Sequence, residues 1–166
     1  MDPAQIASLV TSLGPEDLAE MLNRMGVGFD AHVGIRFTWA SPERVVATLT
    51  PGLEHTQPYG LVHGGVYCTA AETTCSVGAA LCVLSHGQNA VGVENRTRFL
   101  RAARPGGTLT ITATPVSESR GRHTWAAVVV DEAGHRCAES EVVVRALAPH
   151  ARVGGEHVQL ERDLEG

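Results

Sequence analysis

The sequence contains no lysine, and its 13 basic residues, all arginine, are outnumbered by 18 acidic ones. The formal net charge is −5. Proteins that bind nucleic acid generally carry a basic surface, so this balance argues against that class. Aromatic residues are also scarce, at 4%. With 43% hydrophobic residues overall, the chain can still build a core, which must consist mainly of Val, Leu and Ala.

The chain also lacks a long apolar run. No stretch of 18 consecutive apolar residues occurs, so no membrane span is expected. The first residues have no basic start and no apolar signal core, which favours a cytoplasmic protein. A length of 166 residues and a mass of 17.5 kDa suit one domain with tails.

Cysteine is present, but not in the close pairs that bind zinc. Cys68, Cys75 and Cys82 recur every seven residues, which places them near one stripe of a helix, whereas Cys137 stands apart. We expect buried, reduced thiols and no metal site. Three histidines also lack metal-ligand spacing and are expected in loops or on the surface. They are His55, His86 and His123.

Hydrophobic periodicity divides the chain into two helices and six strands. One helix is predicted at 15–25, between Pro15 and a stop at Gly26. A longer helix is predicted from Gly64 to about Ser85, where small and apolar residues lie on all sides. The strands are predicted near 34–39, 44–50, 89–100, 107–117, 122–131 and 135–147. This order predicts an α+β fold in which a mostly antiparallel, six-stranded sheet curls around one long helix.

The motif His63-Gly64-Gly65 lies where the predicted loop 51–63 becomes the long helix. Glycine lets a ligand approach the backbone closely. The first N–H groups of a helix have no partner within it, and the helix dipole favours negative charge there. Such a motif can stabilise an oxyanion that forms on a carbonyl. An ordinary glycine turn with His63 as a polar cap explains the same residues.

Glu72 is the only charged residue between Gly64 and His86. A carboxylate on an enclosed helix is costly unless it is paired or functional. One interpretation is a nucleophile or general base, with Ser76 one turn later to orient a water molecule. The other is a pair with an arginine at a subunit contact. Because Glu72 lies about 12 Å beyond Gly64 along one helix, a site that uses both requires at least a dimer.

Together these motifs resemble the PaaI-like hotdog-fold acyl-CoA thioesterases, over about residues 33–147. The residues that carry the resemblance are Gln57-Pro58-Tyr59-Gly60-Leu61-Val62-His63-Gly64-Gly65, Ala71-Glu72, Ser76, Val91-Gly92-Val93-Glu94, Phe99-Leu100-Arg101 and Trp125. The resemblance implies a hotdog domain at 33–147. It leaves an N-terminal helical extension at 1–32 and a polar tail at 148–166, which is expected to be flexible.

The resemblance implies roles for five residues by their positions in the motif. The Gly64 N–H would bind the thioester oxygen, and His63 and Gln57 would help to place the thioester group. Glu72 of the facing subunit would attack the carbonyl or activate water, assisted by Ser76. The CoA thioester is the substrate, and no further cofactor is expected. A homodimer with two composite sites is implied, often paired again into a homotetramer.

Residues 94–122 hold six arginines against two glutamates in an otherwise acidic protein. Arginine suits phosphate, which CoA carries, because it forms bidentate hydrogen bonds. Arg101 and Arg120 match positions expected to meet the nucleotide end, and Gly65 is expected to contact the substrate. Asn95, in the same segment, is expected to form cross-strand hydrogen bonds.

Two alternatives to a hydrolase stay open at this point. A non-catalytic acyl-CoA-binding or regulatory protein of the same fold would keep the arginines and would not need Glu72. A hotdog dehydratase would usually pair an aspartate with a histidine, a pattern that fits this chain poorly. The sequence does not identify the acyl group. Ala71 stands where the family pattern suggests a bulkier side chain, which predicts a wider acyl pocket.

Overall fold

The computed structural model describes residues 3–26 and 28–157 of the chain. The helices, in chain order, are α1 (Pro3–Ser12), α2 (Pro15–Met25), α3 (Gly28–Val33), the short 3-10 helix η1 (Leu53–His55) and α4 (Gly64–Leu84). The strands are β1 (Arg36–Ser41), β2 (Arg44–Leu49), β3 (Asn89–Phe99), β4 (Leu109–Ser119), β5 (Arg122–Val130), β6 (Arg136–Leu147), β7 (Arg152–Val153) and β8 (Glu156–His157).

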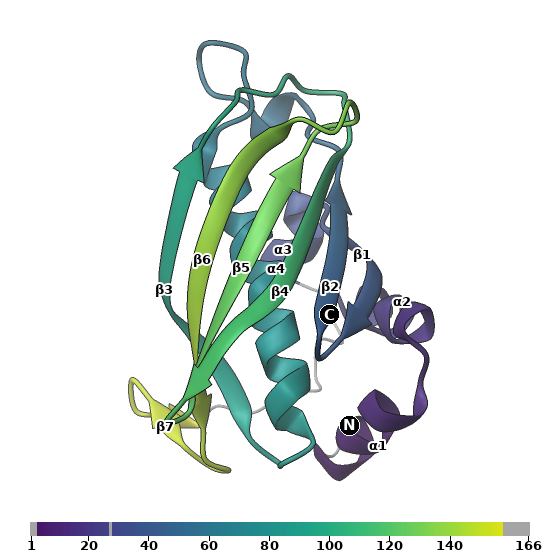
Figure 1. The fold of residues 1–166 in the computed structure, drawn as a ribbon, viewed down its shortest axis with the longest axis vertical. Coiled ribbons are helices and arrows are strands. Elements are labelled where there is room, and N and C mark those ends of the chain that lie inside the picture. The colour runs from purple at the N-terminus through teal and green to yellow at the C-terminus, as the bar shows by residue number, and fades with distance from the viewer. Residues whose placement is uncertain (1–2, 27, 158–166) are drawn as a thin grey trace.

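Six strands form one sheet in the order β1-β2-β4-β5-β6-β3, and every neighbouring pair is antiparallel. The sheet curves around α4, which lies along its concave side (Figure 1). The predicted α+β class is therefore confirmed, with a six-stranded antiparallel sheet wrapped around one long helix. The strands β1 and β3 form the two edges.

The central helix α4 fits closely against the sheet because its buried residues are small. Ala71, Cys75 and Ala79 are fully buried in the core. At Gly78 an added Cβ would lie 2.4 Å from the ring of the fully buried Trp125 on β5. The helix is long and apolar enough to cross a membrane, with a hydropathy of 1.3, but 56% of that window is buried inside the protein. Its apolar character thus serves the core.

Helix α2 confirms the prediction for residues 15–25, whereas α1 and α3 were not predicted. Leu18 and Ala19 of α2 are buried in the core. The Asn23 side chain accepts a hydrogen bond from the Phe37 N–H and donates one to the Phe37 carbonyl, both at 2.8 Å. These bonds use the backbone groups of Phe37 on the edge strand β1, next to the irregularity between Phe37 and Trp39. The N-terminal extension therefore packs on the sheet and covers one edge.

One local prediction is wrong. His123 was expected in a loop or on the surface, but it lies within β5 and is only 5% exposed. In the tail, residues 152–157 form the small, exposed β7–β8 hairpin, and the flexibility of this segment stays a prediction. The expectation for residues 158–166 lies outside the described residues.

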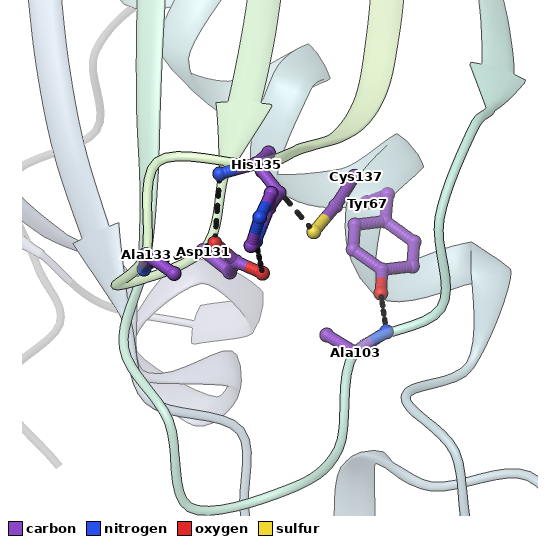
Figure 2. Close-up of polar contacts among 6 residues, drawn as sticks. All are labelled: Tyr67, Ala103, Asp131, Ala133, His135 and Cys137. Atoms are coloured by element: carbon purple, nitrogen blue, oxygen red, sulfur yellow. Dashed lines mark hydrogen bonds and ion pairs between the residues drawn. The ribbon is translucent and has the colours of Figure 1, made fainter.

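The turns between strands are fixed by local chemistry. Arg120 and Gly121 both have positive φ, 49° and 73°, and connect β4 to β5 in a two-residue turn. In the β5–β6 turn, the Asp131 carboxylate accepts hydrogen bonds from the N–H groups of Ala133 and His135 (Figure 2). These bonds, led by that from His135, lower the pKa of Asp131.

Candidate active site

The start of α4 is capped by His63. The Gly65 N–H donates to Nδ1 of His63 at 2.9 Å, so the neutral ring carries its proton on Nε2. Within the described residues no hydrogen bond occupies the Gly64 N–H, which is the first helical amide and has no partner inside the helix. The two glycines of the motif thus differ: the Gly65 amide is used by the cap, and the Gly64 amide remains available.

In the loop before α4, a tight turn contains Gln57 and ends directly before His63. Thr56 and Val62 form an isolated antiparallel bridge, with a tight turn between them. Within this turn Gly60 donates to the Gln57 carbonyl at 2.9 Å. Local backbone bonds therefore fold the segment that holds Gln57 back beside the segment that leads to His63.

The connection that follows β3 crosses the start of α4 and is held there at Ala103. The Ala103 N–H donates to the Tyr67 hydroxyl at 3.1 Å (Figure 2). The Ala103 carbonyl accepts from the Val62 N–H at 3.0 Å. Burial raises the pKa of Tyr67. At the end of β3, Phe99 lies over Gly64, where an added Cβ would be 3.0 Å from its ring. Phe99 also contacts the Tyr67 ring, with centroids 6.1 Å apart.

A pocket of about 340 Å³ opens beside this first turn. Its lining includes His63 and Gly65 together with Phe29, Val66 and Thr69. Glu72 does not line it, and neither does Ala71, which is fully buried in the core. The prediction that Ala71 widens a pocket is therefore wrong for this pocket.

The Glu72 carboxylate lies against β3, and both of its oxygens accept hydrogen bonds. Ser76 Oγ donates to Oε1 at 3.3 Å, and Asn95 Nδ2 donates to Oε2 at 3.0 Å. An added Cβ on Gly92 would lie 2.1 Å from Oε1. The strand is irregular between Gly92 and Glu94, and such bulges often occur next to active sites.

Asn95 and Gly92 are site residues that sequence reasoning missed. Asn95 was expected to bond across the strands, but its side chain donates to α4, to Glu72 and to the Cys68 carbonyl. The signal available in the sequence was weak: a glycine and an asparagine three residues apart in a strand that otherwise looks regular.

Gly64 and Glu72 belong to the same continuous helix, α4, and lie eight residues apart. The helical rise separates their backbones by about 12 Å. Within the described part of one protomer, no ion pair joins Glu72 to an arginine. The protomer thus holds the two halves of the expected site apart.

Arg101 and Arg120 lie at opposite ends of the sheet. The Arg101 N–H donates to the carbonyl of Cys137 near the start of β6. The carbonyl of Gly121, in the turn that also holds Arg120, accepts a hydrogen bond from the Ala146 N–H near the end of the same strand. Nine residues of strand separate these points, about 30 Å. One protomer does not bring the two arginines together.

The thiol of Cys75 is not a competing nucleophile. Cys75 is fully buried, and burial followed by the nearby Glu72 charge raises its pKa far above the usual range of thiols. A reactive cysteine needs the opposite shift. Among the described residues, no group of three or more His, Cys, Asp or Glu could hold a metal ion.

Known proteins share this architecture. The profile of the Thioesterase superfamily matches residues 59–138. The proofreading thioesterase EntH of Cronobacter turicensis is 33% identical over 124 residues, covering 74% of this chain and 89% of that protein. The 1,4-dihydroxy-2-naphthoyl-CoA hydrolase of Escherichia coli is 31% identical over 129 residues, covering 77% and 93%.

Solved structures agree. The Rv1847 protein of Mycobacterium tuberculosis has a TM-score of 0.71 and 33% identity, and the match covers 76% of this chain and 100% of that one. The PaaI protein of Escherichia coli, at 18% identity and a TM-score of 0.71, has the same fold over 81% of this chain and 95% of that one.

The fold and the sequence relatives define the class as a hotdog-fold thioester hydrolase. The chain belongs to the Thioesterase superfamily. The PaaI-like resemblance is therefore confirmed at the level of the family.

Proposed function

We propose that this protein hydrolyses an acyl- or aryl-CoA thioester to the free acid and CoA. The observation that carries the proposal is the Glu72 carboxylate, which is held by Ser76 and Asn95 and not by a cation of its own protomer. These neutral donors fix the position of the carboxylate without pairing it with an opposite charge. The unoccupied Gly64 amide at the helix start supplies the complementary oxyanion donor.

The site is completed by a second copy of the chain. Glu72 and Gly64 are too far apart along α4 to act on one carbonyl, as the helical rise requires. The edge strand β3 has no partner on its outer side within the described residues, and it exposes Val93 and Phe99. Pairing of two copies with their α4 helices antiparallel would bring each Glu72 to the other copy's Gly64. A tetramer would pair two such dimers.

In the reaction, water or Glu72 itself attacks the thioester carbonyl. The negative charge that forms on the carbonyl oxygen is stabilised by the Gly64 N–H, with His63 and Gln57 placing the group. The C–S bond then breaks, and the CoA thiolate leaves and takes up a proton. If Glu72 acts as base, it accepts the proton of the attacking water; if it acts as nucleophile, water cleaves the resulting anhydride.

The substrate is proposed to place its acyl group in the pocket beside Gly65 and to extend its CoA portion toward arginines. A volume of about 340 Å³ is within the range of small-molecule sites. Since Arg101 and Arg120 lie at opposite ends of one sheet, they would meet one CoA molecule only if they came from different copies. The related 1,4-dihydroxy-2-naphthoyl-CoA hydrolase makes an aryl-CoA ester the first choice.

The test is release of free thiol from a panel of acetyl-, octanoyl-, benzoyl-, phenylacetyl-, 4-hydroxybenzoyl- and 1,4-dihydroxy-2-naphthoyl-CoA. The intact protein should cleave at least one ester, and Glu72→Ala should lower kcat at least about 10²-fold. Binding of these esters without any turnover would favour the non-catalytic acyl-CoA-binding protein instead. Full activity of Glu72→Ala would remove the proposed mechanism.

The oxyanion donor is tested by a matched pair at Gly64. Gly64→Pro removes the N–H, whereas Gly64→Ala keeps it and adds the same Cβ against Phe99. Proline is tolerated at the first position of a helix, so both variants should fold. Only the proline variant should lose most of kcat.

The composite site is tested by mixing inactive protomers. A dimer of one Glu72→Ala and one Gly64→Pro chain has one site with both groups intact and one site with neither. Random mixing in equal amounts should therefore restore about a quarter of the unmodified activity. No recovery, with exchange of subunits verified, would place both groups in one protomer.

A further inference from the structure

A chain of hydrogen bonds runs from the sheet to the Glu72 carboxylate. Ser140 on β6 lies opposite Thr97 on β3, with their hydroxyl oxygens 2.9 Å apart. Thr97 Oγ1 donates to Asn95 Oδ1 at 2.7 Å. Asn95 Nδ2 then donates to Glu72 Oε2 at 3.0 Å. The chain thus links β6 and β3 to one carboxylate oxygen on α4.

Counting protons fixes the direction of this chain. The Thr97 hydroxyl has one proton, which goes to Asn95, so Ser140 must donate to Thr97. The two Nδ2 protons of Asn95 go to Glu72 and to the Cys68 carbonyl. A flipped amide would turn its oxygen toward these two acceptors and lose both of these bonds, keeping only a contact with the Thr97 hydroxyl. Every hydrogen bond of the chain therefore donates in one direction, from Ser140 toward the Glu72 carboxylate.

The other carboxylate oxygen is held more loosely. Its donor, Ser76, is one turn along the same helix at 3.3 Å, and the nearby strand position is Gly92, which has no side chain to confine it. Without Asn95, only the longer bond from Ser76 would hold the carboxylate, and the Glu72 side chain could change its rotamer. The bond from Asn95 is thus the contact that selects one position of the carboxylate.

We infer that Asn95 is a positioning residue for Glu72, and that Thr97 and Ser140 orient its amide. This inference rests on the proposed function. Because hydrogen bonds to a charged group are stronger than neutral ones, the effect should decline along the chain from Asn95 to Ser140. The loss of stability on substitution should follow the opposite order and be largest at Ser140, because Ser140 is only 6% exposed and Asn95 is exposed.

The experiment measures kcat, KM and Tm on the ester of the panel above that the unmodified protein cleaves fastest. Asn95→Asp keeps the shape and replaces both N–H donors by an acceptor, and Thr97→Val removes the orienting hydroxyl. Expected losses in kcat are about 10- to 100-fold for Asn95→Asp, about 3- to 10-fold for Thr97→Val and about 2-fold for Ser140→Ala, with KM within about 2-fold.

The matched control is Thr38→Val, at an exposed threonine of β1 whose hydroxyl only bonds the Val46 carbonyl at 3.4 Å. Its kcat should be unchanged. In a Glu72→Ala background, Thr97→Val should cause no further loss, because an orienting residue has nothing left to orient. A merely structural role would reduce both backgrounds alike.

The outcomes separate the two levels of the argument. If Glu72→Ala is inactive while Asn95→Asp and Thr97→Val keep kcat within 2-fold, the positioning role is wrong and the proposed function stands. A further loss from Thr97→Val in the Glu72→Ala background also overturns the positioning role. If the unmodified protein cleaves no ester of the panel, the proposed function falls and this inference falls with it.

Discussion

The central helix and the sheet come close together at two points where a glycine leaves room for the facing side chain. At the first, Gly78 of α4 faces Trp125, and an added Cβ would lie 2.4 Å from ring carbons of that side chain. At the second, the glycine is on the strand: an added Cβ on Gly92 would lie 2.1 Å from Glu72 Oε1. The distances are similar, but the neighbours differ.

This difference separates stability from activity. Trp125 is fully buried and packed on all sides, so it cannot yield without disturbing the core. The Glu72 carboxylate is the far end of a flexible side chain and can move aside at little energetic cost. The contact at Gly78 therefore maintains the fold, and the contact at Gly92 maintains the position of the carboxylate proposed to act in the reaction.

Of the two glycine substitutions, Gly92→Ala should have the larger effect, and on activity alone. The new methyl group would displace the Glu72 carboxylate from Asn95, and a misplacement of about 1 Å can cost about 10²-fold in rate. We expect kcat to fall by about 30- to 100-fold, with Tm within about 2 °C of the unmodified protein. Steady-state kinetics and thermal unfolding measure the two quantities.

Gly107→Ala is the matched control for this substitution. Its added Cβ would find no atom closer than 3.9 Å, and the glycine has no positive φ. Both kcat and Tm should stay unchanged. Unchanged kcat in Gly92→Ala would contradict the comparison, because it would mean that the observed position of Glu72 is not the one used in the reaction.

The substitution Gly78→Ala should act on stability instead. Overpacking a core costs about 1–3 kcal/mol, and alanine returns up to about 1 kcal/mol of helix propensity. A net loss of about 1–2 kcal/mol should lower Tm by about 2–8 °C, with kcat per folded molecule unchanged. In combination with Trp125→Phe, whose ring is shorter, the loss should be smaller than the sum of the two single losses. Additive losses would show that the ring is not the obstacle.

The same division explains what the sequence could predict. The cap at His63 and the free amide at Gly64 follow from neighbours in the chain, and both could be anticipated from the motif. The ends of α4 and of the six large strands also follow from local periodicity and turn residues. Helix α3 was not anticipated because its six residues are too few to show a period.

Contacts between distant segments could not be predicted in this way. Asn95 reaches Glu72 only because β3 pairs with β6 at the sheet edge beside α4, over a sequence separation of 23 residues. The arginines of residues 94–122 look like one cluster in the sequence, yet Arg101 and Arg120 lie at opposite ends of β6. The composition of a segment gives its net charge but does not show where each charged residue lies in the folded sheet.

Tyr67 lies on α4 between Gly64 and Glu72, the two halves of the proposed site. The substitution Tyr67→Phe tests whether this part of the helix contributes to stability or to activity. Removing the hydroxyl deletes the acceptor of the Ala103 N–H and keeps the ring that contacts Phe99. The loss of one hydrogen bond should cost about 1 kcal/mol and lower Tm by about 2–4 °C. The exposed Tyr59 is the control for Tm, because Tyr59→Phe removes a hydroxyl in solvent.

Kinetic measurements then show whether Tyr67 contributes to activity as well as to stability. Ala103 lies in the connection that also carries Arg101, so loosening it should raise KM for the CoA ester by about 2- to 5-fold. The Glu72 carboxylate keeps its bonds to Ser76 and Asn95, so kcat should be retained. A fall in kcat as large as that of Gly92→Ala would show that the helix start and the carboxylate are coupled within one protomer. In that case the two glycine contacts would no longer divide stability from activity.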